Sequence, residues 1–168
     1  MKEPNYLKEI KELIEFVSEK GTFFLLRNNA RYRQLFPDED GYLIFFRNNK
    51  KYKLKASKVA YELGNNSIVS KDHVILHRNL DFEDYRLINL RKITKNQFAL
   101  IKEAHKNLNG ALKLLPHHQD VFSYVLHWRE NGKDRSQVIQ DIVPARKQLV
   151  RLQLKYAKIL STYCLFDI

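Results

Sequence analysis

The chain has 168 residues, of which 44% are apolar, and this is enough for one compact domain with a real core or for two very small ones. Thirty Lys and Arg against nineteen Asp and Glu give a net charge of +11, which favours a polyanionic partner such as nucleic acid. The single cysteine, Cys164, excludes an internal disulfide framework and a zinc site built from several cysteines.

The N-terminus has no charged region followed by an apolar segment, as a secretory signal would have. No run approaches the roughly 18 apolar residues that a membrane-spanning helix needs. We therefore expect no membrane partner and a cytoplasmic protein, located in the host cytoplasm if a phage encodes it.

The first predicted element is an amphipathic helix over residues 4–20, because apolar residues recur there three and four positions apart and Gly21 can end it. We expect the apolar side of this helix to pack on the core. The alternative is that it docks a protein partner. A short apolar run over 23–26 and a polar, basic linker over 28–33 follow, so residues 1–40 are expected to form an N-terminal helix and linker.

Positive charge is concentrated over residues 47–58, RNNKKYKLKASK, which hold six basic residues and no acid. Two strands, 43–46 and 52–54, are expected to meet at Asn48-Asn49, and a short helix capped by Ser57 to end near Gly64. With the period-two alternation of a strand, alternate lysines project to one face while Tyr52 and Leu54 pack on the other. The pattern predicts a cationic ridge that contacts phosphates without reading bases. Its members are Lys51, Lys53 and Lys55.

Residues 72–98, DHVILHRNLDFEDYRLINLRKITKNQF, carry the most specific spacing in the chain. His77 ends a predicted strand, Asn89-Leu90 follow twelve residues later, and Thr94 opens a predicted helix over 95–106. With the intervening Asn79, Asp84, Arg86 and Arg91, this order resembles the core of HNH nucleases, also called ββα-metal nucleases. The resemblance extends over residues 41–106 and is to the homing endonucleases of phage type.

The resemblance implies phosphodiester hydrolysis assisted by one divalent metal, Mg or Mn. It makes His77 the general base, a role that suits a side chain whose ordinary pKa is near 6.5, and makes Asn89 the brace of the loop that orients it. The metal ligands of the family stand at positions that hold Leu76 and Phe98 here, and neither side chain can bind a metal. We therefore expect no metal site and no cofactor, on a scaffold that has lost efficient cleavage.

Other departures and registers bear on the same site. The customary loop glycine is Leu80, and Tyr85 stands where an asparagine often follows the loop acid. Taking Asp72-His73 as ligand and base loses the Asn-Leu match. Displaced ligands remain conceivable on the helix that follows, from Asn96, Gln97 or His105.

In the last third, residues 107–116 are expected to be a linker and residues 121–142 to form a hairpin that turns at Asn131-Gly132. A helix over about 143–163 follows, with Pro144 early, where its missing N–H costs little. Hairpin and helix resemble a much-diverged AP2-type DNA-binding module, whose sheet lies in the major groove. We expect Trp128 to be a core anchor and the basic residues around the turn to touch nucleic acid.

The sequence thus predicts an α+β protein in three parts: an N-terminal helix and linker (1–40), an HNH-like ββα core (41–106) and a hairpin-helix module (107–168). We expect it to bind nucleic acid, in first place double-stranded DNA, as an accessory or regulatory factor. The alternatives are an active HNH nicking endonuclease with His77 as base and a protein-interaction factor that docks through 4–20. The candidate nucleic-acid contacts are Arg47, Lys50, Lys51, Lys53, Lys55, Lys58, Arg78, Arg91, Lys92, Lys95, Arg129, Lys133 and Arg135.

Overall fold

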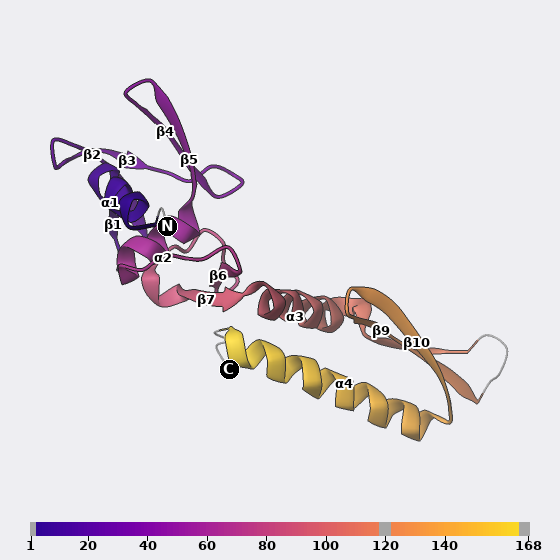
Figure 1. Ribbon diagram of the computed structural model, residues 1–168. Helices are drawn as coiled ribbons and strands as arrows, with labels where there is room; N and C mark the ends of the chain where they lie inside the picture. The colour runs from indigo at the N-terminus through magenta and orange to yellow at the C-terminus, as the bar shows by residue number, and fades with distance from the viewer. Residues whose placement is uncertain (1–2, 118–121, 165–168) are drawn as a thin grey trace. The chain divides into compact units, whose positions relative to one another are not determined.

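A computed structural model describes residues 3–117 and 122–164 and divides the chain into an N-terminal unit, 1–95, and a C-terminal unit, 96–168 (Figure 1). The fold is mixed α+β, as the sequence predicts. The N-terminal unit contains α1 (Glu3–Leu13), β1 (Ile14–Val17), β2 (Thr22–Arg27), β3 (Ala30–Leu35), β4 (Tyr42–Arg47), β5 (Lys50–Lys55), α2 (Ala56–Asn65), β6 (His73–His77), the 3₁₀ turn η1 (Leu87–Asn89) and β7 (Leu90–Thr94). The C-terminal elements are α3 (Lys95–Lys106), the π-helical turn η2 (Asn107–Ala111), β8 (Lys113–Pro116), β9 (Ser123–Glu130), β10 (Lys133–Gln140) and α4 (Ile142–Tyr163).

All sheets are small and antiparallel. In the N-terminal unit β1, β2 and β3 form one sheet, while β4–β5 and β6–β7 are two separate hairpins. In the C-terminal unit the strand order is β10-β9-β8. Among the described residues, no helix is both long enough and apolar enough to cross a bilayer.

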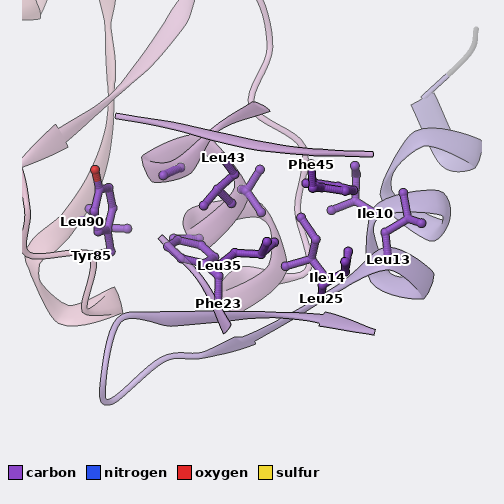
Figure 2. Packing of buried hydrophobic residues seen from close by; sticks show 13 residues of the cluster. Ile10, Leu13, Ile14, Phe23, Leu25, Leu35, Leu43, Phe45, Tyr85 and Leu90 are labelled. Atoms are coloured by element: carbon purple, nitrogen blue, oxygen red, sulfur yellow. The ribbon is translucent and has the colours of Figure 1, made fainter. Parts of the chain in front are cut away.

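The N-terminal unit has one apolar core, to which α1, both β-hairpins of residues 22–55, α2 and the loop before β7 contribute. Figure 2 shows Ile10 and Leu13 of α1 beside Phe45 of β4, with Tyr85 and Leu90 at the other end of the cluster. Residues 1–40 therefore share a core with residues 41–95 and are no separate segment. The apolar side of α1 is covered by this core, which is the interpretation favoured from the sequence.

The first helix is shorter than predicted. It ends at Leu13, and residues 14–17 form β1, which pairs with β2 from Ile14 opposite Leu25 to Val17 opposite Thr22. The prediction of a helix to residue 20 was wrong: Ile14 and Val17 keep a helical spacing, but residues 14–17, Ile-Glu-Phe-Val, are rich in side chains that also favour a strand. Pairing with β2 decides between helix and strand for this segment, and β-branched side chains fit a sheet well.

The predicted linker over 28–33 was also wrong, since it holds a tight turn and most of β3. Three hairpins turn on two residues with positive φ, and these angles are those of a type I′ turn, which matches strand twist. The angles are 53° and 60° at Asn28 and Asn29, 48° and 59° at Asn48 and Asn49, and 53° and 74° at Asn131 and Gly132.

The hairpins β2–β3 and β4–β5 are related by an internal repeat with an offset of twenty residues. GTFFLLRNNARYRQL over 21–35 aligns with GYLIFFRNNKKYKLK over 41–55, including the Arg-Asn-Asn at the turn and a tyrosine three residues after it. In both copies the first and third residues of the aligned apolar run are buried, Phe23 and Leu25 in one, Leu43 and Phe45 in the other. The first strands of the two hairpins therefore present corresponding residues to the same core. The second strands differ, with a register shift between Leu25 and Leu26: Leu35 is buried opposite Phe23, whereas its counterpart Lys55 is exposed.

Gly21 joins the first hairpin to the loop that precedes β7. Its φ is +66°, and a Cβ there would lie 2.7 Å from the backbone N of Arg86 and 2.9 Å from the carbonyl carbon of Tyr85. Only glycine allows this approach. The backbone N–H of Leu87 donates to the carbonyl of Ser18 at 3.1 Å beside it, so the β1–β2 turn positions the loop.

Helix α2 begins without the cap predicted from the sequence. Lys55 is the N-cap residue, no side chain caps the helix, and Ser57 is buried within the first turn. The helix ends at Asn66, whose φ of 49° is left-handed. On its buried side Glu62 accepts a hydrogen bond from the Val69 N–H at 2.8 Å and thereby holds the segment that leads to β6.

The C-terminal unit contains one more strand than predicted. Residues 113–116 form β8, which pairs with β9, where a linker was expected. Helix α3, the hairpin turn at Asn131-Gly132 and α4 lie where they were predicted, α4 within one residue. The Asp141 carboxylate caps α4 by accepting from the Val143 N–H at 3.3 Å.

Candidate functional site: the HNH-like loop and the basic hairpin

The HNH-like loop, residues 77–89, connects β6 to β7, whose pairing ends with His77 opposite Leu90. Asn89 is 2% exposed, and its side chain accepts a hydrogen bond from the Asn79 N–H at 2.8 Å while it donates to the carbonyl of Asp84 at 2.9 Å. One buried amide therefore connects both halves of the loop. This is the bracing geometry expected of Asn89.

Asp84 organises the exposed side of the loop. Its carboxylate accepts from the Arg86 guanidinium at 2.8 and 2.6 Å and from the Asn79 amide at 3.0 Å. The hydrogen bond from Arg86 holds the pKa of Asp84 below its ordinary value. Leu80, where a glycine is customary in the family, has a φ of +62°, a conformation that costs an L-residue about 1–2 kcal/mol.

His77 is buried, with 5% of its surface exposed, and neither ring nitrogen has a hydrogen-bond partner among the described residues. Two aromatic rings enclose it: that of Tyr85 meets it edge-on at 5.4 Å between centroids and that of Phe82 lies at 5.7 Å. Burial lowers the pKa of His77 below its ordinary value, so the ring is neutral at pH 7. A neutral imidazole has the protonation state of a general base, but here it lies beneath aromatic rings.

A divalent metal does not fit the residues beside His77. Leu76 is 2% exposed and supplies only carbon atoms, and Phe98 lies on α3 in the other unit, with the Lys102 ammonium 4.9 Å from its ring centroid. Within residues 3–117 and 122–164 no three His, Cys, Asp or Glu side chains gather in a way that could hold a metal. The alternative ligands have other partners: His73 bonds Ser70, and His105 lies within hydrogen-bonding distance of Asn109.

The basic hairpin, β4–β5, separates its side chains as predicted. One face points to the core, where Phe45 and Tyr52 stack at 5.0 Å between centroids. On the other, three apolar side chains of β4 stand opposite three lysines of β5, in the pairs Tyr42–Lys55, Ile44–Lys53 and Phe46–Lys51. We call these six residues the hairpin face.

The three lysines of the hairpin face form no ion pair with any carboxylate in the part of the chain that the structure describes. Lys53 and Lys55 lie over the Tyr42 ring at 4.4 and 4.6 Å from its centroid, and Lys55 also donates to the Asp40 carbonyl. Lys51 is exposed. The cationic ridge predicted from the sequence therefore exists as a surface.

Three neighbouring cations have structural partners. Arg47 donates to the backbone carbonyls of Leu26 at 3.2 Å and Glu12 at 3.3 Å, and so joins β4 to β2 and α1. Lys50 lies 3.7 Å from the Glu9 carboxylate, and Lys58 lies 3.6 Å from that of Glu62. These contacts, which depend on the fold of α1 and α2, favour a structural role for Arg47 above all.

Around β6 and β7 the candidates differ in exposure. Arg78 is half-buried, with one guanidinium nitrogen 3.5 Å from the carbonyl of Ile88. Arg91, Lys92 and Lys95 are exposed, but Arg91 and Lys92 are adjacent on β7 and so point to opposite sides of that strand.

The C-terminal candidates do not share one face. Arg129 pairs across the hairpin with Asp134 and lies 3.7 Å from its carboxylate, whereas Lys133 stands opposite Glu130 and Arg135 opposite Trp128. Because side chains alternate, Lys133 and Arg135 point to the face opposite that of Arg129. That these three residues touch nucleic acid stays a prediction, and they would do so from two faces of the hairpin. Trp128 is half-buried.

Sequence reasoning missed Ile44 and Phe46 as surface residues. Ile44 is 37% exposed and Phe46 is 67% exposed, although both stand in the apolar run YLIFF. The period-two alternation that placed the lysines also predicts that Ile44 and Phe46 are exposed, since they are the cross-strand partners of Lys53 and Lys51.

No protein-family model, curated protein or solved structure matches this chain.

Proposed function

We propose that the protein is an HNH-endonuclease-like nucleic-acid-binding protein that has lost efficient cleavage and acts on DNA as an accessory or regulatory factor. The observation that carries the binding function is the hairpin face, where Lys51, Lys53 and Lys55 are arrayed on one side of β5 with no acidic partner among the residues that the structure describes. The net charge of +11 adds a long-range attraction for polyanions.

The loss of cleavage is supported by the surroundings of His77. A general base must reach a water beside the scissile phosphate, yet His77 is enclosed by Phe82 and Tyr85. The neighbouring Leu76 is a buried hydrocarbon where the family has a ligand. The hydrogen bonds of the Asn89 side chain with the Asn79 N–H and the Asp84 carbonyl hold the loop together, and they require no catalysis.

Binding is tested by titrating the full chain into a labelled duplex of about 20 base pairs at several salt concentrations. The affinity should fall steeply with salt, with a log–log slope of roughly −0.9 per phosphate contacted. Changing Lys51 and Lys53 together to Gln should reduce that slope. A matched control is Lys8→Gln with Lys20→Gln, which removes the same charge from exposed sites of the same unit. Absence of binding to both duplex and single-stranded DNA at low salt would refute the proposal.

The second candidate is an active nicking endonuclease, favoured by one observation. Among the described residues, neither nitrogen of the buried, neutral His77 forms a hydrogen bond of good geometry, although the Asp81 backbone acts on its pKa, and such a group is often functional. Supercoiled plasmid with Mg²⁺ or Mn²⁺ separates the candidates. We expect equal, background nicking by the parent protein and by His77→Ala; nicking that depends on His77 would establish the nuclease.

A protein-interaction factor that docks through the first helix has less support. Ile10 and Leu13 of α1 are 2% and 5% exposed because they belong to the core, so they are not available to a partner.

A further inference from the structure

The two repeated hairpins differ on their outer faces in a way that indicates what the second one binds. In β2–β3 the position corresponding to Lys51 is Arg31, whose guanidinium forms two 2.7 Å hydrogen bonds with Glu15 and lies 4.6 Å from the Phe24 ring centroid. The third strand, β1, supplies this acid. The charge of Arg31 is therefore neutralised within the fold.

The corresponding face of β4–β5 has no such partner strand, because β4 and β5 form a two-stranded sheet. On the hairpin face, each cross-strand pair places an apolar side chain of β4 opposite a lysine of β5. Phe46, at the end of this row near the turn, is 67% exposed, and Lys51 stands directly opposite. An exposed aromatic ring beside lysines that have no acidic partner among the described residues offers both a stacking surface and positive charge, and so fits a ligand that is both flat and anionic.

We propose that the hairpin face binds an unpaired nucleic-acid strand, with a base stacked on Phe46 and the flanking phosphates on Lys51 and Lys53. Bases in a single strand expose their flat faces, whereas those of a duplex are stacked on one another. Duplex phosphates alone would engage the lysines but leave Phe46 and Ile44 uncovered. The inference rests on the nucleic-acid binding proposed above and assigns the hairpin face to an unpaired strand.

The test compares a labelled 20-nucleotide oligothymidylate with a duplex of the same length, using the full chain. Phe46→Ala should weaken single-strand binding about tenfold and change duplex binding less than twofold, because one base–aromatic stack is lost. Phe46→Trp should preserve it. Phe36→Ala is the matched control, since Phe36 is equally exposed, at 73%, and lies outside the hairpin face. Lys51→Gln with Lys53→Gln should reduce the single-strand salt slope by about 1.4, or 0.7 per phosphate.

The outcomes separate the two proposals. If neither nucleic acid binds at low salt, the proposed function fails and this inference falls with it. If binding persists but Phe46→Ala changes nothing, weakens duplex and single strand equally, or matches Phe36→Ala, only the assignment to an unpaired strand is overturned. Vesicles containing phosphatidylserine form the third arm: binding to them that needs Phe46, without a Phe46 effect on oligothymidylate, would assign the surface to anionic lipid.

Discussion

The side-chain oxygen of Asn89 accepts a hydrogen bond from the backbone N–H of Asn79, ten residues earlier in the sequence, at 2.8 Å. The same side chain donates to the Asp84 carbonyl, so a buried amide replaces backbone pairing where β6 and β7 have already separated. We expect Asn89→Ala to destabilise the protein by about 2–4 kcal/mol, because two backbone groups would lose their partner in a buried place.

Urea unfolding measures this loss, and hydrogen exchange at the Asn79 amide reports it locally. The control is Asn79→Ala, which removes exposed side-chain bonds to Asp84 and Asp81 and should cost less than about 1 kcal/mol. Equal effects of the two substitutions would contradict the bracing role.

His77 should make stability depend on pH in a defined direction. Because burial lowers its folded pKa, its protonation favours the unfolded chain, so stability is complete above the unfolded pKa near 6.5 and declines as pH falls from there toward the folded pKa. Replacing His77 by Leu removes the titrating group. As the pH is lowered from about 7 to about 5, the parent should therefore lose unfolding free energy relative to His77→Leu. A difference that stays constant over this range would refute the prediction.

Glu62 gives the opposite case of a buried acid. Desolvation raises its folded pKa, so the stability present below the unfolded pKa, near 4.3, is lost as pH rises from there through the folded pKa. Glu62→Gln keeps an acceptor for the Val69 N–H and should stabilise the protein at pH 7 but not at pH 4. Glu62→Ala should destabilise it by about 1–3 kcal/mol through the unpaired amide.

Denaturant unfolding at the two pH values checks this, with Glu83→Gln as a control that removes an exposed carboxylate. If Glu62→Gln is less stable than the parent at pH 7, the ion pair with Lys58 outweighs the burial of the charge, and the stated direction is wrong.

Arg47 and Lys51 stand four residues apart but should respond differently to substitution. Arg47→Ala deprives two backbone carbonyls of their donor and should cost about 1 kcal/mol of stability. Lys51→Ala should leave unfolding unchanged and lower the salt slope of DNA binding by roughly 0.9 for a duplex. Parallel unfolding and binding titrations decide, and a loss of stability with Lys51→Ala would place that lysine among the structural cations.

The features that the sequence predicts well are those set by neighbouring residues. The Asn131-Gly132 hairpin, the lysine side of β5 and helix α3 follow from turn chemistry and periodicity, which need no distant partner. Leu80 of the HNH-like loop is the exception, since nothing local predicts that a leucine adopts a φ of +62°.

The features that were missed depend on pairing and packing partners outside the segment itself. Residues 14–17 have an apolar spacing compatible with a helix and become a strand only by pairing with β2. In the sequence Arg47 is one more cation beside the lysines of this segment. Its hydrogen bonds to the carbonyls of Glu12 and Leu26 arise only when α1 packs on β4. The repeat of residues 21–35 in 41–55 was available in the sequence and would have predicted β3.

In the C-terminal unit, Arg129 is held by its backbone rather than by its charge. Its N–H donates to the Asn107 side-chain oxygen at 2.8 Å, and its carbonyl accepts from the Asn107 amide at 2.8 Å and from the Tyr156 hydroxyl at 3.0 Å. The Asn107 side chain thus hydrogen-bonds the backbone of β9 as a neighbouring strand would, along the edge of β9 that also pairs with β8. Tyr156, which is buried on α4, connects that helix to the same carbonyl.

Since two donors share one carbonyl, their contributions should not add. We expect Tyr156→Phe to cost about 1 kcal/mol and Asn107→Ala about 2–3 kcal/mol, because the alanine also leaves the Arg129 N–H unpaired. The double variant should lose more than the sum, by roughly 0.5 kcal/mol or more, since only then does the Arg129 carbonyl lack any donor. A double-mutant cycle in urea measures the coupling, and strict additivity would mean that the two hydrogen bonds stabilise α4 and the β9 strand independently.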